Sequence, residues 1–108
     1  MLDKEKVREI AKKYSDEVRK VLNPASVILF GSYVNGTPRE WSDIDIAVLV
    51  NDVKDEKWYD SRILLQKIRW GEDNFTDIEP HLLNLNYDPS GFVKHVIDTG
   101  EVVYSGSS

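Results

Sequence analysis

Apolar residues at the start of the chain recur at the spacing of an amphipathic helix. Over residues 3–22 they line one face while lysine and glutamate fill the others, which predicts a helix with one side packed on a core. Asn23-Pro24 ends this helix, because the residue before a proline disfavours helical backbone angles. The short apolar and β-branched run at residues 26–30 then predicts a buried strand.

The middle of the chain predicts a second strand and a second long helix. Residues 33–42 contain glycine, proline and polar residues, so we expect a turn or short helix followed by a loop. Residues 43–50 predict a strand that is continuously apolar from Ile46, and residues 55–70 predict a helix that Gly71 ends. The side chains expected to face inward from this helix are those of Trp58, Tyr59, Ile63, Leu64, Ile68 and Trp70.

The last third of the chain predicts a strand, a helix and a short final strand. A strand lies within residues 75–85, where Pro80 indicates a strand end, an edge or a bulge. A third helix opens at residues 88–90 and ends at Gly100, and residues 102–104 add the final strand. The apolar face of that helix carries Phe92, Val93, Val96 and Ile97.

This order of elements predicts an α/β (α+β) fold in which helices flank a small mixed β-sheet. The connection between the first two strands, residues 31–42, lacks a long crossover helix, so we expect those strands to be antiparallel. The 108 residues suffice for one domain, which we assign to residues 1–104, with residues 105–108 as a flexible tail.

Composition narrows the functional classes. Hydrophobic residues make up 41% and charged residues 31%, which excludes global disorder. The net charge of −5 disfavours direct nucleic-acid binding, although a divalent cation can join an acidic protein to a nucleotide. No cysteine is present, which excludes disulfides, zinc–thiolate sites and thiol nucleophiles. The charged N-terminus and the absence of a long apolar run predict a soluble, cytoplasmic protein without a membrane partner.

Gly31-Ser32 directly follows the first strand. A glycine there permits a tight turn and close approach of a ligand, and the free N–H groups of a helical turn that begins at Ser32 suit a phosphate. Taken alone, the dipeptide favours an ordinary transition from strand to turn.

Two pairs of acidic residues alternate along predicted strands. Asp43 and Asp45 share one face of the second strand, roughly 6–7 Å apart, and a cation such as Mg²⁺ would relieve their repulsion. A solvated strand edge with Asp43 capping the loop explains this pair equally well. Asp77 and Glu79 share a face of the third strand, and one of them could join the first pair if the strands are neighbours. Three carboxylates could hold two ions about 4 Å apart for phosphoryl transfer, although a solvated strand face remains the alternative.

Together, these features resemble a known family. Gly31-Ser32, the ten residues 33–42 and then Asp43-Ile44-Asp45 resemble the signature of the DNA polymerase β-like nucleotidyltransferase superfamily. The short length and the run from Gly36 to Asp45 resemble the minimal nucleotidyltransferase (MNT) group within it. The resemblance covers the whole chain, including the helix before the first strand and residues 100–104, and it implies the polymerase β-like fold.

The resemblance implies roles for the residues of the motif. Gly31 and Ser32 would bind the triphosphate of a nucleotide, and Asp43 and Asp45 would bind magnesium and, through it, the nucleotide. The implied reaction is attack of an acceptor oxygen on the α-phosphate of a nucleoside triphosphate, with ATP as the expected donor and pyrophosphate as the leaving group. Positioning and charge neutralisation dominate such chemistry.

A third carboxylate would complete the metal site and act in catalysis. Glu79 is favoured over Asp77, because the run Ile78-Glu79-Pro80-His81 looks like the corresponding strand of relatives. His81 lies on the same alternating face, where a structural hydrogen bond is a simpler expectation than proton transfer. His95 is expected on the surface and Trp41 in partial packing, and the other aromatics, Trp58, Tyr59 and Trp70, in the core or an interface.

One position departs from the family pattern, and this departure affects whether the chain needs a partner protein. Many relatives carry a basic residue just before the second glycine of the turn, where this chain has Asn35. Arg39 of the same loop, or a partner, could supply the missing charge. MNT proteins often pair with a helical HEPN-domain protein, so the resemblance implies an antitoxin that adenylylates such a toxin. The alternatives are an inactive antitoxin that acts by complex formation, and an aminoglycoside-type transferase that needs a partner subunit or a second copy of this chain.

Overall fold

Four strands form one mixed sheet in the computed structural model, which describes residues 3–36, 43–51 and 55–106. The strand order is β3-β2-β1-β4. β1 (Ser26–Phe30) runs antiparallel to both β2 (Ile44–Val50) and β4 (Glu101–Ser105), and β2 runs parallel to β3 (Ile78–Asn84). The predicted mixed sheet and the predicted antiparallel pairing of the first two strands are therefore confirmed.

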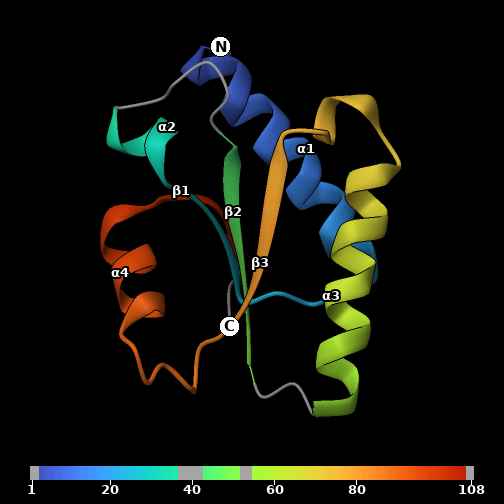
Figure 1. Ribbon diagram of the computed structural model, residues 1–108, viewed down its shortest axis with the longest axis vertical. Helices are drawn as coiled ribbons and strands as arrows, with labels where there is room; N and C mark the ends of the chain where they lie inside the picture. Colours follow the sequence, from blue (N-terminus) through green and yellow to red (C-terminus); the bar gives the residue numbers. More distant parts are fainter. Residues whose placement is uncertain (1–2, 37–42, 52–54, 107–108) are drawn as a thin grey trace.

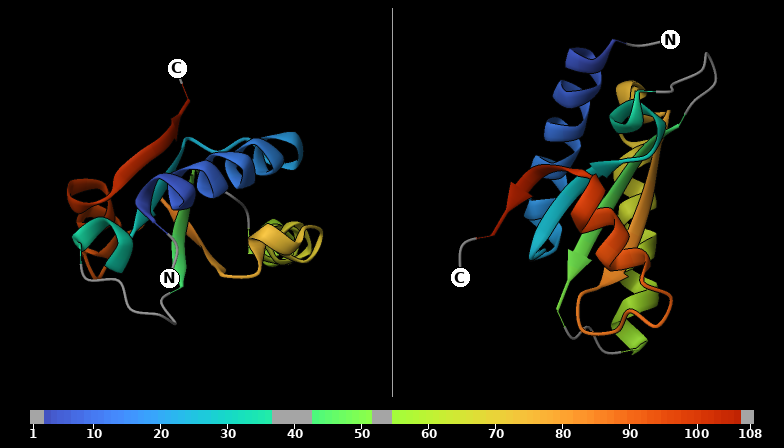
Figure 2. Two further views of the ribbon diagram at one scale, coloured as in Figure 1. Left: turned by 90° about the horizontal axis from the view of Figure 1, so that it is seen from above. Right: turned by 90° about the vertical axis from the view of Figure 1, so that its left-hand side faces the viewer.

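The helices lie on both faces of this sheet (Figures 1 and 2). α1 (Lys4–Val21) and α3 (Asp55–Trp70) cover one face, and α4 (Phe92–Thr99) lies on the other. The single turn α2 (Ser32–Asn35) follows the end of β1, and its Tyr33 packs in the same core as α1. A short 3-10 helix, η1 (Asp73–Phe75), joins α3 to β3. The bounds of α1, β1 and α3 follow the predicted ones closely, because each carries a local apolar period and an end signal. α4 ends before Gly100 as predicted but begins at Phe92, after the predicted start at residues 88–90.

α1 packs along its whole length on the centre of the sheet. Asp3 caps it by accepting a hydrogen bond from the Lys6 amide at 2.8 Å. Tyr14 is fully buried, donates its hydroxyl hydrogen bond to the Leu65 carbonyl at 2.8 Å and meets the ring of Phe75 edge to face. The larger core lies under this helix and includes Val7, Ile10, Ala11, Val18, Leu29, Ile44, Ile46 and Val48.

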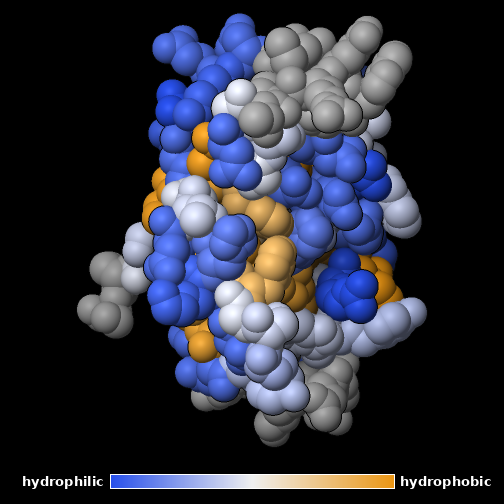
Figure 3. Space-filling model, turned by 60° about the vertical axis from the view of Figure 1, so that its left-hand side comes forward, coloured by the Kyte–Doolittle hydropathy of each residue, from blue (hydrophilic) through white to orange (hydrophobic). Residues whose placement is uncertain are grey.

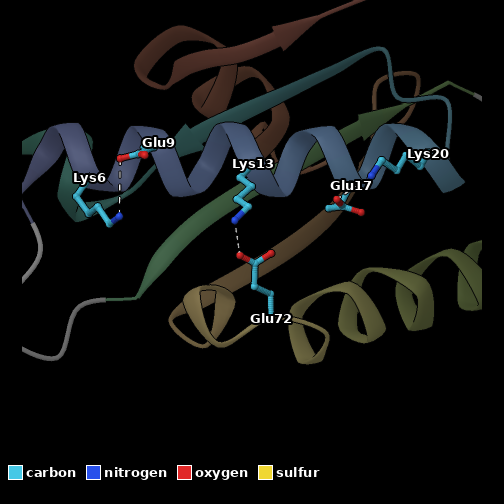
Figure 4. Close-up of polar contacts among 6 residues, drawn as sticks. All are labelled: Lys6, Glu9, Lys13, Glu17, Lys20 and Glu72. Carbon is cyan, nitrogen blue, oxygen red and sulfur yellow. Dashed lines mark hydrogen bonds and ion pairs between the residues drawn. The ribbon is translucent and has the colours of Figure 1, made fainter.

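The solvent side of α1 carries lysine–glutamate pairs (Figure 4). Two of them, Lys6–Glu9 and Lys20–Glu17, lie within the helix, at 3.8 and 2.9 Å. Lys13 instead reaches Glu72, just before η1, at 2.6 Å. Exposed pairs of this kind contribute little each, so α1 is held mainly by its buried face.

The predicted inward face of α3 is wrong for three residues. Leu65 is buried and Trp58 and Ile68 pack against the core, but Tyr59 is 67% exposed, Trp70 is 73% exposed and Ile63 is exposed too. The physical reason is that another helix already covers most of this face of the sheet. α1 already occupies the centre of this face, so α3 packs mainly against α1, β3 and η1 among the described elements and buries a narrow stripe. The remaining apolar side chains line a shallow hollow beside Pro80 of β3.

Similar corrections apply to the last helix and strand. Val93 and Val96 of α4 are buried, but Phe92 and Ile97 of the predicted face are exposed. An apolar strip is visible between hydrophilic surfaces on the side of the molecule that carries α2 and α4 (Figure 3). β4 extends to Ser105, which lies in the predicted tail, and the Gly106 amide then donates to the Ala25 carbonyl at 2.8 Å.

Pro80 lies on an outer strand of the sheet, because β3 pairs with β2 alone among the described strands. The edge position is one of the three that the sequence allowed, and it tolerates a residue that lacks a backbone donor. Among residues 3–36, 43–51 and 55–106, no helix combines the length and apolar character needed to cross a bilayer.

Candidate functional site

The register of the central strands brings acidic side chains together. Asp45 pairs with Phe30 of β1 on one side and with Glu79 of β3 on the other. Ile44 and Ile46 point into the larger core and are fully buried. By alternation the Asp45 side chain lies on the opposite face, where it is 24% exposed. The site therefore lies where β1 ends and β2 and β3 begin (Figure 1).

Three side chains form a compact cluster there. One ligand atom each of Asp45, Glu79 and His81 lies within 4.8 Å of the other two. His81 Nε2 is 3.3 Å from Asp45 Oδ1 and 4.0 Å from Glu79 Oε1. The structural hydrogen bond expected for His81 is thus present, and the ring also packs edgewise on Phe30, with centroids 5.2 Å apart.

The pKa of Glu79 is raised by burial and, to a smaller extent, by the neighbouring carboxylates. Burial is the largest cause that raises its pKa, and the His81 ring opposes this shift. The Asp45 charge raises the pKa further, as does a hydrogen bond from the protonated Glu79 carboxyl to Asp43. The exposed Asp43 at the entrance to β2 therefore also raises the pKa of Glu79, although it lies outside the compact cluster of described residues.

Gly31 connects the two halves of the sequence motif. Its φ of +85° is a conformation that side chains disfavour, and a Cβ there would collide with Asp45 Oδ2. Its carbonyl accepts hydrogen bonds from the amides of Val34 and Asn35 at 3.1 and 3.0 Å, which holds the turn of α2. Gly31 thus lets the chain turn directly against the acidic cluster, and the half-buried Ser32 follows at the start of that turn.

The other candidate residues occupy different places. Asp77 is exposed before β3 and lies outside the compact cluster of described residues, and its backbone carbonyl accepts the Ile44 amide at 2.7 Å. His95 is exposed on α4, and Asn35 is exposed at the end of α2. Arg39 and Trp41 lie outside the described residues. The choice of Glu79 rather than Asp77 as a metal ligand stays a prediction, and the parallel register places Glu79 beside Asp45.

This donor set fits a divalent cation. Carboxylate oxygens are ligands for Mg²⁺, which completes its shell with waters and phosphate oxygens. A cation would also remove the repulsion that raises the pKa of Glu79. Asp43, Asp45 and Glu79 are the residues that would hold it, next to the turn at Gly31. Such a site can neutralise a polyphosphate and orient it for attack.

Comparisons with known proteins show the family and the fold of the chain. The family model described as "Polymerase beta, Nucleotidyltransferase" matches residues 5–108. A comparison with curated proteins gave no significant match. Among solved structures, a protein from Sulfolobus solfataricus that is provisionally described as a nucleotidyltransferase matches with a TM-score of 0.69 and 20% identity, covering 94% of this chain and 83% of that one. At this identity the likeness concerns the fold.

Two further solved structures are toxin–antitoxin complexes. One contains a tri-AMPylated Shewanella oneidensis HEPN toxin with its MNT antitoxin, and it matches with a TM-score of 0.59 and 24% identity over 92% of this chain and 73% of that one. The other is a toxin–antitoxin complex with AMP-PNP, at a TM-score of 0.57 and 25% identity over 98% of this chain and 76% of that one. The chain therefore belongs to the polymerase β nucleotidyltransferase family, within which it corresponds to a minimal nucleotidyltransferase domain.

Proposed function

We propose that this chain transfers AMP from ATP, in the presence of Mg²⁺, to a hydroxyl group of a HEPN-type toxin and thereby acts as its antitoxin. The observation that carries the proposal is the contact of Gly31 with Asp45, which places the turn after β1 directly beside the cluster of Asp45, Glu79 and His81. A triphosphate and a divalent cation need this juxtaposition of a close backbone turn and carboxylates.

In the proposed reaction, the acceptor oxygen forms a bond to the α-phosphorus while the bond to the β-phosphate oxygen breaks. The acceptor hydroxyl loses its proton and pyrophosphate leaves. Mg²⁺ held by the carboxylates would supply charge neutralisation in this reaction. Gly31 and Ser32 would position the triphosphate, and Asp43, Asp45 and Glu79 would hold the cation. Glu79 would also take up the acceptor proton. Its side chain is 54% exposed, which leaves it accessible to a second substrate.

Two observations support a protein acceptor. First, the match to the complex of an MNT antitoxin with a tri-AMPylated HEPN toxin covers 92% of this chain and 73% of the other chain. In addition, Asn35 of α2 is exposed and uncharged where many relatives have a basic residue. A partner protein could bring the cation that the triphosphate lacks at this place.

The direct test uses labelled ATP, Mg²⁺ and the HEPN protein encoded beside this chain. We expect label on the partner with the wild type and with Asp77→Asn, since Asp77 lies outside the compact cluster. We expect a loss of at least about a hundredfold in rate with Asp43→Asn, Asp45→Asn and Glu79→Gln, because each removes charge needed in the transition state. Equal labelling by all variants, or none by the wild type, would contradict the proposal.

A second candidate function is neutralisation by complex formation alone. The uncharged Asn35 at the end of α2 favours it, because the resemblance implies a basic residue for triphosphate binding at this position. The two functions separate in cells that express the toxin. Asp45→Ala protects such cells only if binding suffices, whereas it fails to protect them if AMP transfer is required. Co-purification of Asp45→Ala with the toxin shows that the variant still folds and binds.

A further inference from the structure

His81 has the chemistry of a metal ligand that the proposed reaction does not require. It follows Glu79 by two residues on β3, so both side chains lie on the same face of the sheet. The register sets Ala47 of β2 opposite His81, and the small alanine side chain leaves room for the ring to approach Asp45. An imidazole nitrogen thus stands beside two carboxylates in one cluster.

The distances suit a shared coordination shell. Donor atoms bound to one ion at roughly 2.0–2.2 Å lie about 3 Å apart when adjacent in the shell and about 4 Å apart when opposite. His81 Nε2 is 3.3 Å from Asp45 Oδ1 and 4.0 Å from Glu79 Oε1. The donor atoms of Asp45 and Glu79 lie within 4.8 Å of each other, so one ion could contact all three side chains after small side-chain rotations.

Packing fixes the direction of the imidazole. The His81 ring lies edgewise against Phe30 at an interplanar angle of 61°, and Phe30 in turn packs edgewise on Phe92 with centroids 5.7 Å apart. The ring is only 29% exposed, so its position is set by these aromatic neighbours. Nε2 is consequently held toward the carboxylates before any ion arrives.

Donor chemistry decides which ion such a position favours. Mg²⁺ prefers oxygen ligands and retains its waters, whereas imidazole nitrogen binds first-row transition ions well. We propose that His81 is a direct ligand of an ion shared with Asp45 and Glu79, and that it makes this position select a divalent first-row transition ion over Mg²⁺. The inference rests on the proposed function in one respect. The proposed function supplies a second ion, the Mg²⁺ that accompanies the triphosphate at Asp43 and Asp45.

The closing experiment uses the untagged chain without nucleotide, so that AMP transfer plays no part. The chain has two histidines, which makes His95→Ala the matched control for His81→Ala, because His95 is exposed on α4 and lies outside the cluster of described residues. Mn²⁺ is added, and pulsed electron paramagnetic resonance detects ¹⁴N coupling from a directly bound imidazole. We expect this coupling in the wild type and in His95→Ala, and its loss in His81→Ala.

Co²⁺ and Mg²⁺ titrations then measure selectivity through the Co²⁺ absorption bands and the thermal midpoint. We expect Co²⁺ affinity in His81→Ala and His81→Gln to fall by more than the roughly tenfold loss that an outer-shell partner causes, with Mg²⁺ affinity nearly unchanged. Absence of ¹⁴N coupling in the wild type, or equal losses for both ions, would overturn the proposal and leave His81 as a hydrogen-bond partner of Asp45. AMP transfer with Mg²⁺ could persist in that case, so the proposed function would stand independently.

Discussion

The two faces of the same sheet have opposite characters, and β2 contributes to both. On the face under α1, Ile44, Ile46 and Val48 are fully buried. On the other face, Ala47 and Leu49 pack under α4, but Asp45 is beyond its reach and partly exposed. A long helix that covers a whole face produces a core, whereas the eight residues of α4 cover part of a face and leave a place where charges remain hydrated.

Two glutamates repeat this contrast. Arg8 donates two hydrogen bonds to Glu101, at 2.7 and 2.9 Å, and this pairing lowers the Glu101 pKa. Glu79 instead faces other carboxylates, and its pKa is raised, first by burial and then by those charges. Glu101 is therefore paired with a cationic side chain of the fold, whereas Glu79 is a residue for which we propose a bound metal ion.

The largest expected effect is on the covered face. Ile46→Ala removes a fully buried side chain from the larger core, so we expect about 2–5 kcal/mol less free energy of unfolding in urea denaturation. Ile97→Ala, on the exposed side of α4, should stay within about 0.5 kcal/mol. Similar losses of unfolding free energy in the two variants would contradict the distinction between the face under α1 and the exposed side of α4.

The next effect concerns the turn against the site. Gly31→Ala introduces a side chain at φ +85° and in collision with Asp45, so we expect a loss on the order of 1–3 kcal/mol in stability together with loss of Mg²⁺-dependent stabilisation. Gly91→Ala is the matched control, because Gly91 has φ +79° with no atom within 4 Å of the added Cβ. If both variants lose the same stability and both keep their response to Mg²⁺, the contact with Asp45 has no importance.

A smaller change is expected from the open face itself. Asp45→Asn removes one charge that repels Glu79, so stability without metal should be unchanged or rise by up to about 1 kcal/mol. The same variant should lose most of the rise in thermal midpoint that Mg²⁺ produces in the wild type. A full Mg²⁺ response in Asp45→Asn would exclude this residue as a ligand.

The smallest effect is a pH dependence of opposite sign for the two glutamates. The raised pKa of Glu79 contributes stability below the ordinary glutamate value of 4.5, and that contribution is lost as pH rises through the folded pKa. The lowered pKa of Glu101 contributes stability above 4.5, which is lost as pH falls through its folded pKa. Between about pH 3 and pH 7, the stability of Glu79→Gln relative to the wild type should therefore rise with pH. The stability of Glu101→Gln relative to the wild type should fall over the same range, from about pH 3 to pH 7.

Both glutamate differences should stay within about 1 kcal/mol, because these side chains are partly solvated. Urea unfolding at several pH values without divalent ions measures them. Parallel pH profiles for the two variants would show that the environments of Glu79 and Glu101 do not differ as described.

Local patterns were sufficient to determine much of the fold. The bounds of β1 and α3, the mixed sheet and the antiparallel pairing of β1 with β2 all follow from short-range periodicity, end signals and connection length. The spacing between Gly31-Ser32 and the pair Asp43 and Asp45 likewise indicates the family from the sequence alone. Such features depend on residues close together in the chain, which is why the sequence alone determined them.

Only the tertiary structure decided the register between β2 and β3 and how much of each helix is buried. The alternation of Asp77, Glu79 and His81 left open which side chains meet Asp45, and the parallel pairing of β2 with β3 placed Glu79 and His81 beside it. The apolar residues of α3 left open how much of the helix is buried, and α1 occupies the centre of the face, so Tyr59 and Trp70 remain exposed. Periodicity shows which faces of an element are apolar, but the neighbours that pair with it or cover it are distant in the sequence and are set by the packing of the whole domain.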